Sequence, residues 1–469
     1  MVKQGFDPDF PDGTAAEISV IRNAKLPQPS ASIRDLRQFL WSSIDNQVSR
    51  DLDQIELAER TDDGIRVLVG IANVSQSVRV GSQLDAHASS QTTTVYTAAR
   101  IFPMLPIELS TDLTSLNQNE DRPAIVIEML VNREGLITSS EIYRALVRNK
   151  AQLAYEDVGP WLAGSGPAPT KVAASTELAA QLKLQDEAAC LIRAQRVRLG
   201  ALNFERVEAS PVMDGNEVKG VTAVAKNRAG QLIEDFMIAA NESMATNLRR
   251  MNRSGIQRVV KSPERWPRIR ELAQQCGNAL PDNPDAPALA RFLKSRQAAD
   301  PDHYSDLSLS IIKLLGPGEY MLVKPGDAEE GHFSLAVHDY THSTAPNRRF
   351  ADLVTQRIIT AGLDGDAPPY ADDDLAKIAA NCTLKEDAAR KVERNMSKRV
   401  AAVAMANRIG QSFQAIVTGV TPKGVFVRVV NPPVEGRLMR GEAGVDVGDK
   451  FQVKLVNTDP QHGFVDFGR

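Results

Sequence analysis

Three aspartates, Asp45, Asp51 and Asp53, lie within nine residues of one another in the segment IDNQVSRDLDQ. Asp51 and Asp53 are two residues apart, so their side chains point to the same side of an extended segment. Asp45 can join them if the intervening residues form a loop. Such carboxylates are the hard oxygen ligands that Mg²⁺ and Mn²⁺ prefer, and two such ions about 4 Å apart can activate water against a phosphodiester. The other interpretation is a polar loop with capping aspartates, and the short pattern taken alone favours it.

A second group of polar residues lies in HFSLAVHDYTHSTAPNRRFADLVTQRII, residues 332–359. Pro346 predicts the start of a helix, since proline is preferred in the first turn. Arg348 and Arg349 would then lie near the helix N-terminus. Free backbone N–H groups together with guanidinium donors make a phosphate-binding site.

The histidines and cysteines do not form a regular metal-binding motif. The histidines before this helix are spaced by six and four residues, which favours a structural role: His332, His338 and His342. The cysteines are odd in number and far apart: Cys190, Cys276 and Cys382. This excludes a disulfide framework and predicts a reducing cytoplasm as the compartment.

The elements that position these residues mix strands and helices, which predicts an α+β fold. The segment 55–75 is typical of a β-hairpin, and 125–134 of another strand. Helices are predicted at 33–41, 139–152, 226–252 and 349–362. The region 1–35 is rich in Pro, Asp, Gly and Ser, so we expect an N-terminal arm with little core of its own.

The last third of the chain predicts a helix followed by a small barrel. Val392, Met396, Val400 and Val403 fall on one helical face, and we expect this helix to end at Gly410. Residues 411–469 then contain about five short alternating segments separated by turns. This pattern is typical of a barrel of the OB type.

The composition fits a globular protein of two to four domains. The chain has 469 residues, 42% of them hydrophobic, with 55 Lys+Arg against 59 Asp+Glu and a formal net charge of −4. This charge argues against a protein that coats nucleic acid through bulk positive charge, but allows a local basic channel. No apolar run is long enough to span a membrane, and the N-terminus lacks the apolar core of a signal peptide, so no membrane association is expected.

Six segments in one order resemble the catalytic domain of the ribonuclease II / ribonuclease R (RNB) family. Besides the aspartate and TAPNRRFADL segments, they are VLVGIANVSQSVRVGSQLD at 67–85, FPMLPIELSTDLTSLN at 102–117, YRALVRNKAQLAYEDV at 143–158 and LIEDFMIAANESMA at 232–245. The resemblance implies an RNB-like catalytic domain over 36–410, with a mixed sheet and surrounding helices enclosing a channel. It implies an S1-like RNA-binding domain of the OB fold over 411–469.

The resemblance also implies an activity. The expected function is processive hydrolytic 3′→5′ degradation of single-stranded RNA to nucleoside 5′-monophosphates, with Mg²⁺ as cofactor, or Mn²⁺ in its place. The expected partner is single-stranded RNA, and a monomer is expected. The family often carries two cold-shock barrels before its catalytic domain, and the arm is too short to contain them.

The resemblance assigns roles to individual residues. Asp45, Asp51 and Asp53 match three of the family's four active-site aspartates, which makes them the expected catalytic and metal-binding residues. The fourth position is Gln54, and a nearby family aspartate is Asn73. These two amides motivate a second hypothesis, an RNA-binding protein of the same fold with weak or no catalysis. A third hypothesis is a metallo-phosphodiesterase that acts on something other than RNA.

The remaining assignments concern substrate contacts. Arg348 matches an arginine that contacts the scissile phosphate, and Tyr155 a tyrosine at the scissile end, so both are expected catalytic residues. The expected RNA-binding residues are Tyr96, Phe204, Glu234, Arg349 and Phe426. Aromatic stacking tolerates any base sequence, and contact with the ribose 2′-hydroxyl distinguishes RNA from DNA. For each aromatic, the alternative is ordinary packing in a core.

Overall fold

The computed structural model describes all residues except 205–207, 215–216, 225–226, 329–330 and 430. Its centre is a six-stranded sheet in the order β1-β8-β2-β3-β4-β7. The bounds are β1 Ile33–Asp35, β2 Trp41–Asp45, β3 Gln54–Thr61, β4 Gly64–Ala72, β7 Asp121–Val131 and β8 Ile137–Ala154. β8 pairs in parallel with β1 and β2, and the other neighbours are antiparallel. The sheet is therefore mixed.

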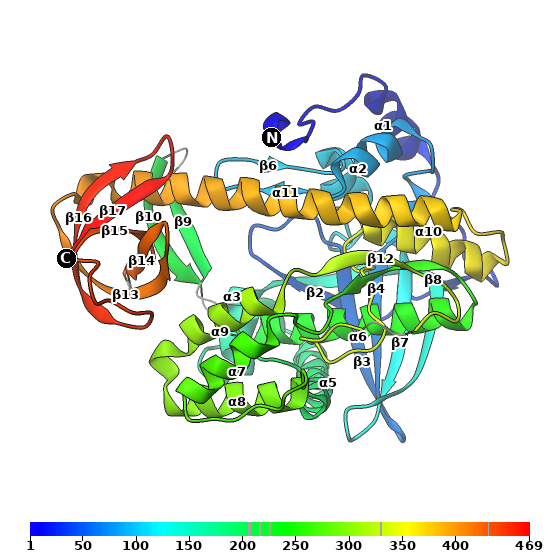
Figure 1. Ribbon diagram of the computed structural model, residues 1–469. Helices are drawn as coiled ribbons and strands as arrows, with labels where there is room; N and C mark the ends of the chain where they lie inside the picture. The colour runs from blue at the N-terminus through cyan, green and yellow to red at the C-terminus, as the bar shows by residue number, and fades with distance from the viewer. Residues whose placement is uncertain (205–207, 215–216, 225–226, 329–330, 430) are drawn as a thin grey trace.

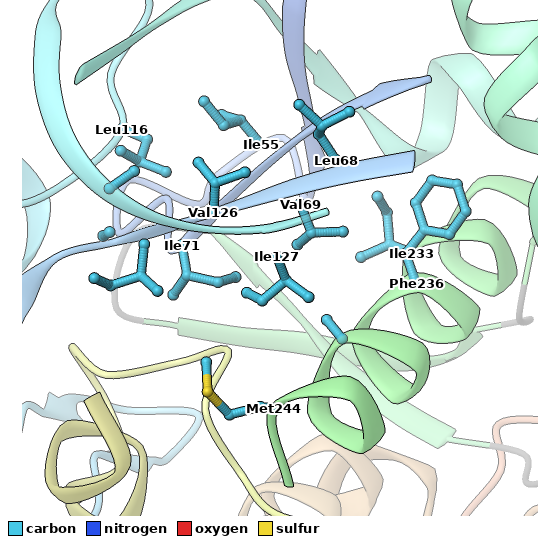
Figure 2. Packing of buried hydrophobic residues seen from close by; sticks show 14 of the residues in the cluster. Ile55, Leu68, Val69, Ile71, Leu116, Val126, Ile127, Ile233, Phe236 and Met244 are labelled. Atoms are coloured by element: carbon cyan, nitrogen blue, oxygen red, sulfur yellow. The ribbon is translucent and has the colours of Figure 1, made fainter. Parts of the chain in front are cut away.

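Helices cover this sheet and enclose its apolar side chains. Ile233, Phe236 and Met244 of α6 (Arg228–Arg250) lie beside Val69 and Ile127 of the sheet in one buried cluster (Figure 2). The long β4 and β7 strands carry buried runs, because β4 lies between β3 and β7, and β7 also pairs with β8. This rigid layer is the platform from which the site residues project.

The other helices surround this core or extend from it. Their bounds are α1 Thr14–Asn23, α2 Gln83–Gln91, α3 Tyr155–Leu162, α4 Thr170–Ala173, α5 Thr176–Leu199, α7 Trp266–Gln275, α8 Ala286–Ala299, α9 Pro301–Leu315, α10 Phe350–Asp364 and α11 Asp372–Met405. α7, α8 and α9 share a separate apolar cluster that includes Trp266, Phe292 and Tyr304. The short strands form three pairs: β5 Val95–Tyr96 with β6 Ile101–Phe102, β9 Glu208–Asp214 with β10 Glu217–Val224, and β11 Gly255–Val259 with β12 Glu319–Val323.

The C-terminal segment forms a closed barrel in the strand order β13-β14-β15-β17-β16. The bounds are β13 Ser412–Thr421, β14 Gly424–Val429, β15 Glu435–Arg440, β16 Lys450–Asp459 and β17 Phe464–Gly468. α11 extends from α10 to this barrel (Figure 1). Ala402 and Met405, near its end, belong to the barrel's buried cluster, so the barrel packs directly on the helix.

The structure confirms the α+β class, the hairpin (β3 and β4), the strand at 125–134 (β7), the helices at 226–252 (α6) and 349–362 (α10), and the five-stranded barrel. No helix within the described residues is long and apolar enough to cross a membrane.

Three predictions about elements were wrong. The predicted helix at 33–41 is instead β1 and the start of β2, because both pair with β8. The predicted helix at 139–152 is β8 itself, whose pairing with three strands outweighs a weak helical period. The C-terminal helix ends at Met405, followed by a short 3₁₀ turn, Ala406–Arg408, so it does not extend to Gly410.

Candidate active site

The three aspartates lie where β2 ends and β3 begins. Asp45 is the last residue of β2, and Asp51 and Asp53 come just before β3. Asp45 pairs with Ala154 at the end of β8, and Tyr155 follows as the first residue of α3. The sheet register therefore brings Asp45 and Tyr155 to the same edge, although 110 residues separate them in the sequence.

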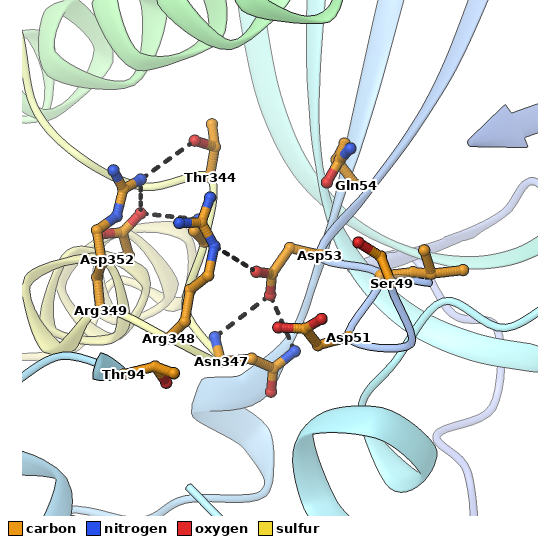
Figure 3. A network of polar contacts seen from close by, with 12 residues as sticks. Ser49, Asp51, Asp53, Gln54, Thr94, Thr344, Asn347, Arg348, Arg349 and Asp352 are labelled. Carbon is orange, nitrogen blue, oxygen red and sulfur yellow. Dashed lines mark hydrogen bonds and ion pairs between the residues drawn. The ribbon is translucent and has the colours of Figure 1, made fainter. Parts of the chain in front are cut away.

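Asp53 is buried, with 3% of its surface exposed, and contacts the TAPNRR segment. It accepts hydrogen bonds from Asn347 Nδ2 at 2.9 Å and from the Asn347 backbone N–H at 3.3 Å. Arg348 Nε lies 3.6 Å from its other oxygen (Figure 3). Burial raises the pKa of Asp53 to about 7, although Arg348 acts in the opposite direction. Ionisation of the Asp53 carboxyl group therefore costs free energy, and a bound cation could offset that cost.

Asp45 and Asp51 have different partners. Asp45 accepts hydrogen bonds from Ser49 Oγ at 2.9 Å and from the Asn46 backbone N–H at 2.6 Å. Burial nevertheless raises the pKa of Asp45. The Tyr96 hydroxyl donates to Asp51 Oδ2 at 3.3 Å, while 41% of the surface of Tyr96 is exposed. The aromatic ring thus lies beside the aspartates and is open to a ligand.

Tyr155 lies in the same electrostatic environment. Burial raises the pKa of its hydroxyl, and the nearby carboxylates of Asp45 and Glu56 raise it further. The Tyr155 hydroxyl therefore stays protonated at neutral pH and serves as a hydrogen-bond donor rather than as a base.

The loop that carries Arg348 is fixed by buried amide and carboxylate groups. Asn241 of α6 accepts hydrogen bonds from the Ser343 backbone N–H and hydroxyl, both at 2.8 Å. Asp352 of α10 accepts from the Ala345 backbone N–H at 2.8 Å. The Arg348 side chain is 45% exposed, so a rigid loop presents a guanidinium that can still contact a phosphate.

The structure places Arg349 differently from Arg348. α10 begins at Phe350 rather than near Pro346, which corrects the predicted helix start. Arg349 Nη2 lies 2.7 Å from Asp352 Oδ1. Its guanidinium thus forms an ion pair within α10 and its N-cap rather than with the aspartates between β2 and β3. Contact of Arg349 with RNA stays a prediction.

The two amides at expected acidic positions make local contacts. Gln54 is buried, and its side chain points away from Asp53 (Figure 3), with Nε2 3.5 Å from the Ile44 carbonyl. Asn73 Oδ1 accepts a hydrogen bond from Ser75 Oγ at 2.8 Å. Neither amide brings a charge to the site.

The remaining predicted RNA-binding residues lie on three other elements. Phe204 is half-buried against the α7–α9 cluster. Glu234 lies on the exposed face of α6. Phe426 is half-buried on β14, opposite Arg437 of β15. Their roles stay predictions.

The histidines take structural positions, in line with the sequence interpretation. His342 is half-buried, and its Nδ1 lies 2.8 Å from the Tyr320 hydroxyl. Burial lowers the pKa of His332 to about 4 and that of His342 well below its ordinary value. Both rings pack edge-on against Tyr340.

A divalent ion fits the chemistry of this site. Within the described part of the chain, no three His, Cys, Asp or Glu side chains converge as a preformed metal-binding group. Mg²⁺, however, usually binds through one or two carboxylates together with waters and substrate phosphates. The donors here are all carboxylate oxygens, and Asp53 is a buried carboxylate that a cation would stabilise. Asp45, Asp51 and Asp53 are the residues that would hold it.

Sequence reasoning missed Asn347 and Asn241. Asn347 adjoins the predicted Arg348, so its position within the TAPNRR segment was an available signal. Asn241 begins a short polar run, residues 241–243, within the otherwise apolar segment FMIAANESMA. That pattern indicates a polar contact in the core without identifying the partner.

Comparison with known protein families yields two matches. Residues 33–365 match the RNB domain, and residues 411–469 match the RNase II-type exonuclease C-terminal S1 domain. Among curated proteins, ribonuclease R 1 of Lactococcus lactis is 28% identical over 92% of this chain and 56% of its own length. Ribonuclease R of Escherichia coli K12 is 27% identical over 91% of this chain and 53% of its own length. The chain thus spans about half the length of these relatives.

Solved structures share the fold. Mycoplasma genitalium RNase R in complex with ribose methylated single-stranded RNA superposes with a TM-score of 0.89 at 22% identity, over all of this chain and 76% of that one. Yeast Ssd1, described as a pseudonuclease, superposes with a TM-score of 0.71 at 18% identity, over 92% of this chain and 56% of that one. Because the RNB match covers more than half of the sequence and the fold agrees, this chain belongs to the RNB family.

Proposed function

We propose that this protein is a processive hydrolytic 3′→5′ exoribonuclease that degrades single-stranded RNA to nucleoside 5′-monophosphates. The observation that carries the proposal is the contact of Asp53 with Asn347 and Arg348, beside Asp45, in an RNB-family chain. A carboxylate group for metal binding and an arginine for phosphate binding are the two parts that phosphodiester hydrolysis needs.

The residues have separable roles in this reaction. Asp45, Asp51 and Asp53 would hold Mg²⁺, or Mn²⁺ in its place, and such an ion would supply charge stabilisation and make a nearby water more acidic. Arg348 binds the scissile phosphate and stabilises the charge that develops on it. Water adds to phosphorus, the bond from phosphorus to the 3′-oxygen breaks, and that oxygen leaves with a proton as a 3′-hydroxyl.

The aromatic residues would hold the RNA without reading its sequence. Tyr96 combines an exposed ring with a hydroxyl anchored on Asp51, which suits stacking on a base next to the metal site. Tyr155 donates a hydrogen bond at the scissile end. Base stacking contributes about 1–3 kcal/mol per base and is sequence-tolerant, as a nonspecific exonuclease requires.

A second candidate function is RNA binding without cleavage. Gln54 and Asn73 favour it, because both replace charged positions with neutral amides. The fold likeness to yeast Ssd1 shows that this fold also occurs in a protein described as a pseudonuclease.

One assay separates these candidates. The full chain is incubated with poly(A) labelled at either the 5′ or the 3′ end, with Mg²⁺ or Mn²⁺. Stepwise shortening of the 5′-labelled strand, with release of labelled mononucleotide from the 3′-labelled strand, supports the exoribonuclease. Tight binding without shortening under either metal would contradict it and support the second candidate. Cleavage of a model phosphodiester but not of poly(A) would indicate a different substrate.

A further inference from the structure

We propose that Phe6 is a positioning residue for RNA binding, which holds the hairpin β5–β6 so that Tyr96 faces the aspartates. This inference rests on the proposed exoribonuclease function, in which the exposed Tyr96 ring stacks on a base. It assigns a role to a segment that precedes residues 33–365, the part of the chain that matches the RNB domain.

Phe6 is a buried side chain in a segment rich in polar residues, MVKQGFDPDFPDG. Only 2% of its surface is exposed. It forms one buried cluster with Val95 of β5 and Ala389 of α11, and Phe102 of β6 packs against that cluster. The N-terminus accordingly lies beside β6 and α11 (Figure 1). Phe6 therefore joins the hairpin to the long helix.

The turn before Phe6 is fixed by its own backbone and by Lys385 of α11. Gly5 adopts a φ of +80°, a left-handed conformation that favours glycine, and its backbone N–H donates to the Val2 carbonyl at 2.9 Å. The Lys385 ammonium donates to the Gly5 carbonyl, and Lys385 Nζ lies 5.0 Å from the centre of the Phe6 ring. These contacts hold the Phe6 ring in one place on the helix.

The hairpin β5–β6 is too short to be stable without such packing. Each strand has two residues, and an isolated two-stranded hairpin is marginal in water. Successive side chains of a strand point to opposite faces. Val95 therefore faces the Phe6 cluster, while Tyr96 faces the other way, where its hydroxyl donates to Asp51. The Tyr96 backbone N–H also donates to Glu393 Oε1 of α11 at 2.9 Å.

The base of the hairpin is held independently of Phe6. The Thr94 backbone N–H donates to the Arg348 carbonyl at 2.9 Å, and buried contacts with α6 and α10 hold the same arginine loop. Loss of the Phe6 ring should therefore displace Tyr96 and leave Arg348 in place. The expected consequence is weaker RNA binding with little change in the cleavage step.

The alternative is that Phe6 only stabilises the fold by anchoring the N-terminal segment. Phe6→Ala would then lower the Tm but leave the RNA affinity of the folded chain unchanged. A double-mutant cycle with Tyr96 separates the two roles. If Phe6 acts through Tyr96, its substitution has little effect on RNA binding once the Tyr96 ring has been removed, so the two effects are not additive.

The test measures the Kd of the full chain for labelled poly(A) in EDTA, by filter binding at a temperature where every variant is folded. Tyr96→Ala should raise the Kd by about 10-fold and Phe6→Ala by about fivefold, as expected for loss and partial loss of one stacked base. In the Tyr96→Ala background, Phe6→Ala should change the Kd by less than about twofold. Phe6→Leu keeps an apolar side chain in the cluster and should retain most of the affinity.

Phe10→Ala is the matched control. Phe10 lies in the same segment, but its ring packs on His87 of α2, with ring centres 4.4 Å apart, and it is outside the Phe6 cluster. Its Kd for poly(A) should not change. Single-turnover cleavage with Mg²⁺ at saturating enzyme should stay within about threefold in Phe6→Ala, because the Phe6 contact is absent from the chemical step.

Two results would overturn the proposal: an unchanged Kd in Phe6→Ala, or an effect of Phe6→Ala that is equally large with and without the Tyr96 ring. If Phe6→Ala does not fold, Phe6→Val leaves a smaller cavity and passes through the same cycle with the same two criteria. A Tyr96-dependent effect of Phe6 on binding, without cleavage of poly(A), contradicts the proposed function alone. Cleavage with Phe6-independent binding contradicts this inference alone.

Discussion

At the residue scale, Asp53 joins the two halves of the candidate site. Its carboxylate contacts Asn347 and Arg348, which lie almost three hundred residues later in the sequence. We expect Asp53→Asn to abolish cleavage of poly(A) because an amide is a poor ligand for a hard cation. RNA affinity should change little, since the groups that we propose to bind RNA remain.

The measurement pairs single-turnover cleavage with filter binding of the same labelled poly(A). The cleavage rate is expected to fall by about 100-fold or more, with a Kd close to that of the unchanged chain. Asp63→Asn, in the exposed turn between β3 and β4, is the matched control. An affinity loss as large as the rate loss would contradict a purely catalytic role for Asp53.

The raised pKa of Asp53 predicts a pH-dependent stability difference. Its pKa of about 7 lies above the ordinary value of 3.8, so the folded state binds the proton more tightly than the unfolded state. Asp53 therefore favours folding below pH 4, and this contribution is lost as the pH rises through 7. In EDTA, the Tm of Asp53→Asn minus that of the unchanged chain should increase from pH 5 to pH 8. A difference that stays constant with pH, measured by thermal unfolding, would show that Asp53 does not titrate in this range.

The sequence alone was sufficient to identify those residues of the candidate site that lie close together in the chain. Asp45, Asp51 and Asp53 lie in one segment, and Arg348 in another, so spacing and the family resemblance were sufficient to select them. The role of Asn241 was not predictable in this way. It depends on the contact of Asn241 with Ser343, which only the packing of α6 against the arginine loop reveals.

At the element scale, the helices and strands that were predicted correctly and those that were predicted wrongly differ in how much local signal their sequences carry. The hairpin of β3 and β4 and the helices α6 and α10 carry local signals, a short turn or an amphipathic period, and were predicted. β8 receives its conformation from pairing with β7, which directly precedes it, and with β1 and β2, which lie far earlier in the sequence. Its residues alone permit a helix, so its identity depended on tertiary context.

The helix α6 determines the position of the arginine loop through Asn241. We expect Asn241→Ala to lower the free energy of unfolding by about 1–3 kcal/mol, because it leaves the buried Ser343 backbone N–H without an acceptor. The loop that presents Arg348 should then loosen, so cleavage should fall more than RNA binding. Chemical denaturation and single-turnover cleavage measure the two effects. Asn241→Asp keeps the acceptor oxygen and should retain more of the activity, and equal losses in both variants would contradict this positioning role.

At the scale of the whole molecule, the charge would suit a local rather than a general interaction with the RNA that we propose as substrate. The net charge of −4 includes the acidic residues that would hold metal, and residues 411–469 contain seven Lys+Arg and six Asp+Glu. The barrel would therefore attract RNA only weakly through charge. Its contribution should come from contacts with aromatic side chains, and its packing on the end of α11 holds it at a fixed place relative to the catalytic part.

A substitution of Phe426 in the full chain tests whether the barrel contributes to RNA binding and not to the cleavage step. If its half-buried ring stacks on RNA, Phe426→Ala should raise the Kd for poly(A) by about 10-fold, since one stacked base contributes about 1–3 kcal/mol. Single-turnover cleavage at saturating enzyme should stay within about threefold, because a barrel contact is absent from the chemical step. Phe464→Ala, at an exposed phenylalanine on β17 of the same barrel, is the matched control.

A chain lacking residues 411–469 should show the same separation with a larger affinity loss. If single-turnover cleavage falls as far as binding in these variants, the barrel acts on the catalytic site itself and the assigned division is wrong.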